Sequence, residues 1–263
     1  TSGARGAIVG GTSNRTSSTY TFVGAGTANA AQDSFATIGG GYKNSGTTSF
    51  AAVFAGAINV ASGLRSLIVA GSGNTASSTF SVVVSGQLNA ASGYGSIVVG
   101  GQGHISSGKN SFIGGGGAFY YGVSYGNVAS GDYSAIVGGS NHNSTASYTF
   151  IGGGNANLAS ATFSVVVGGG QNSATTASAA IVGGTSNSAY GSTSFIGAGS
   201  QNKSGGNSSF VGGGQQNTST GSTSGILAGF QNSASGNYSA VIAGRNNATN
   251  GIYSMVSNGR NNT

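Results

Sequence analysis

A glycine returns at a fixed distance along this chain, and that period limits its possible folds more than any other feature. Glycine recurs at every fifteenth position from Gly11 to Gly116, and again from Gly139 to Gly259. We call the members of these two series the repeat glycines. Only the step from Gly116 to Gly139 is longer, by eight positions. A period below about 20 residues is too short for a helical pair and fits one coil of a β-solenoid.

The period therefore predicts an all-β, parallel β-solenoid: a single array over residues 1–263 with 17 coils, each one period long, and an 8-residue insertion within 117–126. The third residue before each repeat glycine is Ile or Val in all 17 coils. β-Branched residues favour strands and pack well on a pleated surface. We expect this column to form the inner ridge of the core, and its members include Ile136, Ile151, Val166, Ile181 and Ile196.

Strand alternation adds the fifth and first residues before each repeat glycine to the inner side. The opposite side is also apolar, and its two positions exchange volume: Phe150 is followed by Gly152, whereas Val165 is followed by Val167. Such exchange indicates a confined space. The sequence thus predicts a strand covered on both faces. The second cover is either another chain, most simply in a three-chain bundle, or a second sheet layer of the same chain.

The third residue after the repeat glycine is almost always Asn, and we call this set the asparagine column. The two exceptions are His104 and His142, and Asn127 takes the place in the coil with the insertion. Asn and His both tolerate positive φ at corners. We expect the column to form turns, with a stacked amide ladder as a further expectation, and its histidines to be structural. Members are Asn14, Asn29, Asn44, Asn157, Asn172, Asn187, Asn202 and Asn217.

The insertion is rich in aromatic residues. Solenoid insertions form loops on one face, and exposed tyrosines can stack on sugars or anchor a neighbouring chain. The alternative is that these rings only cover their own loop. The candidate surface-contact residues are Phe119, Tyr120, Tyr121 and Tyr125.

Composition excludes several classes of protein. The hydrophobic share of 37% argues against disorder, and the charged share is only 4%. The net charge of +6 is scattered along the chain rather than clustered, so no nucleic-acid partner is expected. No stretch approaches the roughly 20 apolar residues that cross a bilayer, so no membrane insertion is expected.

The side chains needed for catalysis are scarce. Asp33 and Asp132 are the only carboxylates, and they lie too many coils apart to act as an acid–base pair. Cysteine is absent, and no cluster of carboxylates or histidines suits a metal. We predict no catalytic residue, no metal site, no cofactor and no enzymatic activity. Eight Asn-x-Ser/Thr motifs make glycosylation a further hypothesis, and they begin at Asn14, Asn143, Asn202, Asn207, Asn217, Asn237, Asn247 and Asn261.

One coil has a family resemblance. The segment Ser164-Val165-Val166-Val167-Gly168-Gly169, followed by Asn172 and Ala174, resembles the head repeat of trimeric autotransporter adhesins. That resemblance implies a left-handed parallel β-roll, or solenoid, of three identical chains that binds extracellular matrix or host surfaces. The family's repeat is usually one residue shorter, and its stalk and anchor have no counterpart in this sequence. Phage tail-fibre regions carry similar coils.

The main functional prediction is a non-catalytic structural repeat protein, extracellular or on the cell surface, that forms a stiff fibre. Thr263 stops one repeat position before that of Thr1. Copies are therefore expected to stack end to end, unless the chain is a window of a longer repeat protein. The alternatives are an adhesin head or tail-fibre segment that binds glycans or matrix, and an ice-binding solenoid. The expected partners are lateral and end-to-end copies of the chain, together with glycans.

Overall fold

The computed structural model describes residues 5–117, 119–120 and 123–263, and its secondary structure consists of two-residue strands. The chain divides into two compact units, Thr1–Ser140 and Asn141–Thr263, each described by itself. Both are parallel β-solenoids, and together they contain about 16 turns of about 15 residues, against the 17 coils predicted. The predicted fold class is confirmed, while the left-handed winding of the solenoid and the three-chain bundle stay predictions.

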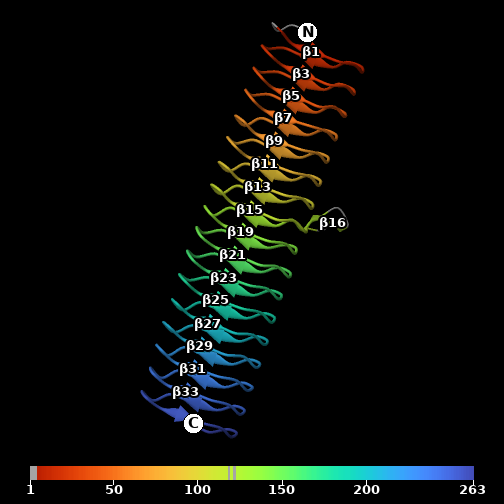
Figure 1. Cartoon of the computed structure of the whole chain (residues 1–263). Coiled ribbons are helices and arrows are strands. Elements are labelled where there is room, and N and C mark those ends of the chain that lie inside the picture. The colour runs from red at the N-terminus through yellow and green to blue at the C-terminus, as the bar shows by residue number, and fades with distance from the viewer. Residues whose placement is uncertain (1–4, 118, 121–122) are drawn as a thin grey trace. The chain divides into compact units, whose positions relative to one another are not determined.

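Each coil contributes one strand to each of two sheets (Figure 1). We call the sheet that contains the Ile/Val column the ridge sheet and the other the return sheet. In the first unit the ridge sheet comprises β1 (Ala7–Ile8), β3 (Phe22–Val23), β5 (Thr37–Ile38), β7 (Ala52–Val53), β9 (Leu67–Ile68), β11 (Val82–Val83), β13 (Ile97–Val98), β15 (Phe112–Ile113) and β19 (Ala135–Ile136). Its return sheet comprises β2 (Arg15–Thr16), β4 (Ala30–Ala31), β6 (Ser45–Gly46), β8 (Val60–Ala61), β10 (Thr75–Ala76), β12 (Ala90–Ala91), β14 (Ile105–Ser106) and β18 (Val128–Ala129).

The second unit repeats this plan. Its ridge sheet comprises β21 (Phe150–Ile151), β23 (Val165–Val166), β25 (Ala180–Ile181), β27 (Phe195–Ile196), β29 (Phe210–Val211), β31 (Gly225–Ile226), β33 (Ala240–Val241) and β35 (Met255–Val256). Its return sheet comprises β20 (Asn143–Ser144), β22 (Leu158–Ala159), β24 (Ser173–Ala174), β26 (Ser188–Ala189), β28 (Lys203–Ser204), β30 (Thr218–Ser219), β32 (Ser233–Ala234) and β34 (Ala248–Thr249).

Strand pairing follows the sequence period. Val166 lies beside Ile181 in the ridge sheet, and Ala174 lies beside Ala189 in the return sheet. The insertion does not disturb this register, because Ile113 pairs with Ile136 across it. The inserted residues form a hairpin of their own, β16 (Phe119–Tyr120) and β17 (Val123–Ser124), which pair antiparallel and lie to one side of the coils of the first unit (Figure 1).

The core of each coil is narrow. The ridge residues Ile136, Ile151, Val166, Ile181 and Ile196 are all 0% exposed. Alanine predominates on the facing side, and Ala174 and Ala189 are likewise 0% exposed. A branched side chain on one sheet therefore packs against a small one on the other. The remaining space holds small residues such as Ser164 and Ala179, five positions before a repeat glycine.

Two sequence expectations about the inner side and the turns are wrong. The residue before the repeat glycine does not face the core: Ala198 and Ala228 are exposed, because each strand ends before that position. The left-handed turn residue is also not the Asn. It is the residue before it, as at Gln171 (φ 55°) and Ser186 (φ 58°), while a second left-handed position follows the return strand.

The repeat glycines are required by both conformation and space. Gly169 has a φ of +89°, and an added Cβ would lie 2.1 Å from the carbonyl oxygen of Gly184 in the next coil. Its neighbour Gly168 differs, because the nearest atom to an added Cβ there is 4.0 Å away. At this corner the close approach of successive coils therefore requires the repeat glycine.

We expect Gly169→Ala to lower the free energy of unfolding by more than about 2 kcal/mol. The new Cβ would overlap the backbone of the next coil, and alanine would be strained at a positive φ. Gly168→Ala should change it by no more than about 0.5 kcal/mol. Chemical denaturation followed by circular dichroism measures both. Equal effects of the two adjacent substitutions would contradict the role assigned to the repeat glycine.

Candidate functional site

The asparagine column lies inside the coils and joins each coil to the next. The Nδ2 of Asn187 donates hydrogen bonds to the carbonyl oxygens of Gly183 and Gly199, both at 3.0 Å. Its Oδ1 accepts a hydrogen bond from the backbone N–H of Asn202 at 2.9 Å. Asn187 and Asn202 are at most 1% exposed. This is a continuous amide ladder within each unit, and its polar atoms are used for structure rather than for binding a ligand.

The two histidines occupy the same ladder position. The Nδ1 of His104 accepts the backbone N–H of Asn127 at 2.9 Å, and the Nδ1 of His142 accepts that of Asn157 at 3.1 Å. Both imidazoles are at most 1% exposed. An Nδ1 that accepts a hydrogen bond must be unprotonated. Burial lowers the pKa of both histidines below their usual 6.5, although the carbonyls of Gly116 and Gly154 act in the opposite direction.

The carboxylates hold turns. Asp33 Oδ1 accepts the backbone N–H of Ser34 at 2.6 Å, and Asp132 Oδ1 accepts that of Lys109 at 2.8 Å. Within the described residues, no group of three His, Cys, Asp or Glu side chains could hold a metal ion. In the described structure each of the two carboxylates therefore accepts a backbone N–H.

The candidate contact residues of the insertion lie in or beside its hairpin. Phe119 and Tyr120 form β16, with Tyr120 opposite Val123. Tyr121 lies outside the described residues. Tyr125 follows the hairpin and is 39% exposed. The structure therefore places an exposed tyrosine next to the coil but leaves the contact role of this loop a prediction.

The outer face of the ridge sheet is apolar and uncovered in both units. In the second unit Val167, Val182 and Leu227 are 48%, 47% and 54% exposed. A second layer of the same chain, one of the two predicted covers, is therefore absent over these described residues. The ring of Phe150 lies over Gly152, 3.4 Å from an ideal Cβ there, so the two outward positions of this strand share one local space.

A ladder of aromatic side chains runs along one edge of the first unit, and it was not predicted from the sequence. The rings of Tyr20 and Phe35 stack 5.1 Å apart, and those of Phe35 and Phe50 stack 4.8 Å apart. The guanidinium of Arg65 continues the stack, 5.7 Å from Phe50 and 5.6 Å from Phe80. The regular spacing of Tyr20, Phe35, Phe50 and Phe80, at whole multiples of the repeat, was the available signal. Because the ring faces contact one another, mainly their edges meet the solvent, and this ladder is poorly suited to stack sugars.

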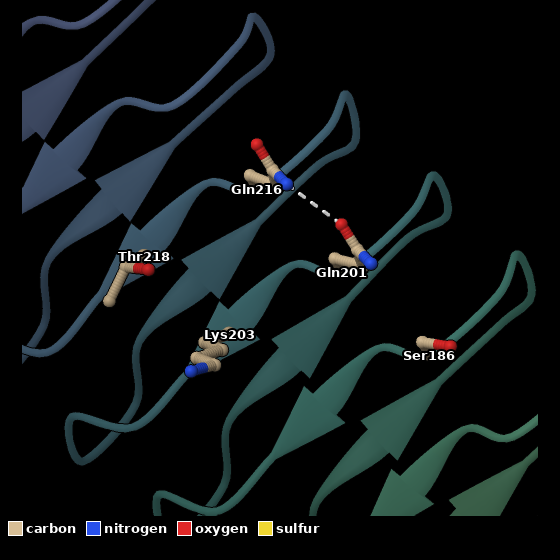
Figure 2. Close-up of a pocket in the computed structure, with 5 residues that line it drawn as sticks. All are labelled: Ser186, Gln201, Lys203, Gln216 and Thr218. Carbon is tan, nitrogen blue, oxygen red and sulfur yellow. Dashed lines mark hydrogen bonds between the residues drawn. The ribbon is translucent and has the colours of Figure 1, made fainter.

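A shallow polar groove of about 380 Å³ lies on the second unit. It runs between turn residues and the outer face of the return sheet, and Figure 2 shows the side chains that line it. The Nε2 of Gln216 donates a hydrogen bond to Oε1 of Gln201 at 2.9 Å. Lys203 and Thr218 lie side by side on β28 and β30 and supply an ammonium and a hydroxyl. This groove was not predicted from the sequence either, although the recurrence of Gln at Gln201, Gln216 and Gln231 was visible.

Compared with known proteins, the chain matches no protein-family model and no curated protein sequence. Across the part of the chain that the structure describes, no helix is long and apolar enough to cross a membrane. The structure shows a parallel β-solenoid, and the resemblance to the heads of trimeric autotransporter adhesins stays a prediction.

We expect the histidines to make stability depend on pH. A base whose pKa is lower in the folded chain takes up protons preferentially when the chain unfolds. The free energy of unfolding should thus be constant above the ordinary His pKa of 6.5 and fall as pH drops below it toward the lower folded values. His104→Asn inserts the residue used in most other coils and should remove part of this loss. Urea denaturation between pH 7.5 and 4.5 measures the effect, and identical pH profiles for variant and parent would contradict it.

Proposed function

We propose that the chain is a non-catalytic structural protein that builds a stiff fibre outside the cell by packing copies of itself side by side through the ridge sheet. The observation that carries this proposal is the exposed apolar face of that sheet in each unit. The outward columns, four and two residues before the repeat glycines, contain no charged residue. Thr37 and Ser257 are their only polar side chains.

The size of this face suits an interface. In the second unit its strongly exposed members are Phe150, Val167, Val182, Phe210, Leu227, Ile242 and Met255. Together they expose on the order of 600 Å² of apolar surface, which approaches the roughly 800 Å² per partner of a standard interface. Continuous apolar patches of this size on soluble proteins mark sites of association.

A second copy of the chain is the partner that fits this face best. Its side chains recur once per coil, and strands in a sheet are spaced about 4.8 Å apart. Another solenoid with the same coil presents the same axial spacing, so that contacts made in one coil are repeated in the next. The absence of charge suits an identical face, because no like charges would meet. The predicted three-chain bundle is the closed arrangement in which each copy buries this face.

The opposite side of the coil supports a one-sided interface. Outward positions of the return sheet carry mostly small or polar residues, such as Ser173, Thr175, Ser188 and Ser233. This side can remain in water while the ridge sheet packs. Stiffness would come from the parallel backbone pairing and the amide ladder, which join every coil of a unit to its neighbours.

Attachment to glycans is a second candidate function, favoured by the groove on the second unit. The groove presents one cation, Lys203, beside the amides of Gln201 and Gln216. Amides and hydroxyls hydrogen-bond sugar hydroxyls, and an ammonium pairs with a sugar carboxylate. An acidic polysaccharide lying along the coils is thus the ligand class that this surface fits.

We expect Val182→Lys combined with Leu227→Lys to weaken self-association by about 100-fold or more, because burying an unpaired ammonium costs several kcal/mol. The matched control is Ser188→Lys with Ser233→Lys, in the same two coils but on the return sheet, which already carries Lys203 on the strand next to Ser188. Analytical ultracentrifugation gives the association constant, and electron microscopy shows whether fibres form. A parent chain that stays monomeric at high concentration, or equal effects of both pairs, would overturn the proposal.

For the second candidate, Lys203→Gln should reduce binding to acidic glycans on an array by about 5-fold. This factor corresponds to about 1 kcal/mol, the free energy that an exposed ion pair contributes. Neutral glycans should be unaffected. Lys43→Gln is the control, since that ammonium lies 5.0 Å from the Tyr42 ring on the other unit. An equal loss in both variants, or no acidic glycan bound by the parent, would exclude a specific role for the groove.

A further inference from the structure

The structure separates the eight Asn-x-Ser/Thr motifs by accessibility. A transferase that attaches a glycan to such a motif must reach the amide nitrogen of the Asn. Because the motif requires Ser or Thr at its third position, that hydroxyl must be reached as well. Both groups must therefore be exposed together if the folded chain is the substrate.

We infer that Asn143 is an N-glycan acceptor site of the folded chain. Asn143 begins β20, and strand alternation turns Ser144 inward while Asn143 and Thr145 face outward. Asn143 and Thr145 are exposed, and Ser144 is 0% exposed. The inward Ser144 hydroxyl lies 2.6 Å from that of Thr149, which holds the strand in place. The amide and the hydroxyl that the motif needs are thus displayed on one side of an extended segment.

Neither outward side chain is committed elsewhere. Among the described residues, none forms a hydrogen bond with the side chain of Asn143 or Thr145. Their backbone N–H groups donate to the carbonyl oxygens of Asn157 and Ala159 in the next coil, both at 3.0 Å. The strand is therefore fixed by its backbone, and its two reactive side chains remain free to enter an active site.

Four motifs begin within the asparagine column and are closed by the fold. Asn202 and Asn217 are 0% exposed, as are the hydroxyl-bearing Ser204 and Ser219 at their third positions. The amide nitrogens that a glycan would need already donate to backbone carbonyls of the ladder. The motifs at Asn14 and Asn247 share this arrangement, with Thr16 and Thr249 turned inward.

The remaining three motifs lie in turns. Asn207 and Asn237 are exposed, but Ser209 and Ser239 at their third positions are each only 1% exposed. Asn261 has a left-handed backbone, with φ of 59°, and its Oδ1 accepts a hydrogen bond from Asn246. Asn143 is thus the motif in which an extended backbone, a free amide and a free hydroxyl occur together.

The modification is an ordinary glycosyl transfer from a polyprenyl-diphosphate-linked oligosaccharide, catalysed by an oligosaccharyltransferase. The bond between the anomeric carbon and the diphosphate oxygen breaks, and the diphosphate leaves with the electron pair. A bond forms between the anomeric carbon and Nδ2 of Asn143, and one amide proton passes to the solvent. The glycan would stand on the return sheet, away from the apolar face of the ridge sheet, so this inference does not depend on the proposed self-association.

The test uses the full, folded chain produced without glycans. It is incubated with a polyprenyl-diphosphate oligosaccharide and a single-subunit oligosaccharyltransferase that needs only the three-residue motif. Mass spectrometry of peptides then gives the occupancy of each site. We expect occupancy at Asn143 to exceed that at Asn202, Asn217, Asn207 and Asn237 by at least about 10-fold. Peptides derived from the urea-unfolded chain should lose this preference for Asn143 when they are offered to the same enzyme.

Two variants test the geometry directly. Thr145→Val keeps the shape of the strand but removes the hydroxyl, and it should abolish occupancy at Asn143. Leu158→Asn places the motif on the same two outward positions of the next coil, with Ala159 inward and Ser160 outward, and residue 158 should become a second acceptor. Circular dichroism verifies that both variants are folded. The inference is overturned if folded chain is not glycosylated at Asn143 while its peptide is, or if ladder motifs are occupied equally.

Discussion

Backbone contact between successive coils is the constraint on which the rest of this structure depends. Parallel pairing requires each coil to lie directly on the next, with no side chain between them at the corner. The repeat glycines leave that space empty, as at Gly169, where a single Cβ would meet the next coil. The asparagine column then gives a donor to the corner carbonyl of Gly183, and a second donor to that of Gly199, which already accepts the backbone N–H of Thr185. Glycine permits the close approach of the coils, and asparagine provides hydrogen bonds to the backbone carbonyls buried there. Each coil has one such corner, so the two columns share one period.

The small interior of each coil leaves the two outer faces as the surfaces on which our functional proposals are based. A coil of about 15 residues has room inside for one branched side chain, one small residue of the return sheet, one ladder amide and a few hydroxyls. Every other side chain faces outward, and the two sheets present different chemistry: apolar on the ridge side, small and polar on the return side. The proposed assembly through the ridge side and the proposed modification or recognition on the return side would then be independent of each other.

Much of the fold could be predicted from the sequence, because the period of Gly169 and its relatives reports directly on the coil. The ridge residues Ile151 and Val166 could be placed in the core for the same reason. The inward orientation of the asparagine column and the left-handed residue before it could not, since Asn suits both an amide ladder and a turn. The strand ends were also hidden: alternation has no sequence signal for where it stops, so residues such as Ala198 were assigned to the core although they are exposed.

The insertion between Gly116 and Asn127 shows what such a chain can tolerate. Ile113 still pairs with Ile136, and Asn127 still takes its ladder position, although a hairpin has been added between them. Because this corner accepts extra residues without shifting the register, a loop can be added to a coil independently of the number of coils. Duplication of a coil would extend the protein, whereas an insertion such as this one adds a hairpin without changing the number of coils. Repeats that arise by duplication of one coil can therefore differ in their loops and outward side chains while keeping the same backbone path.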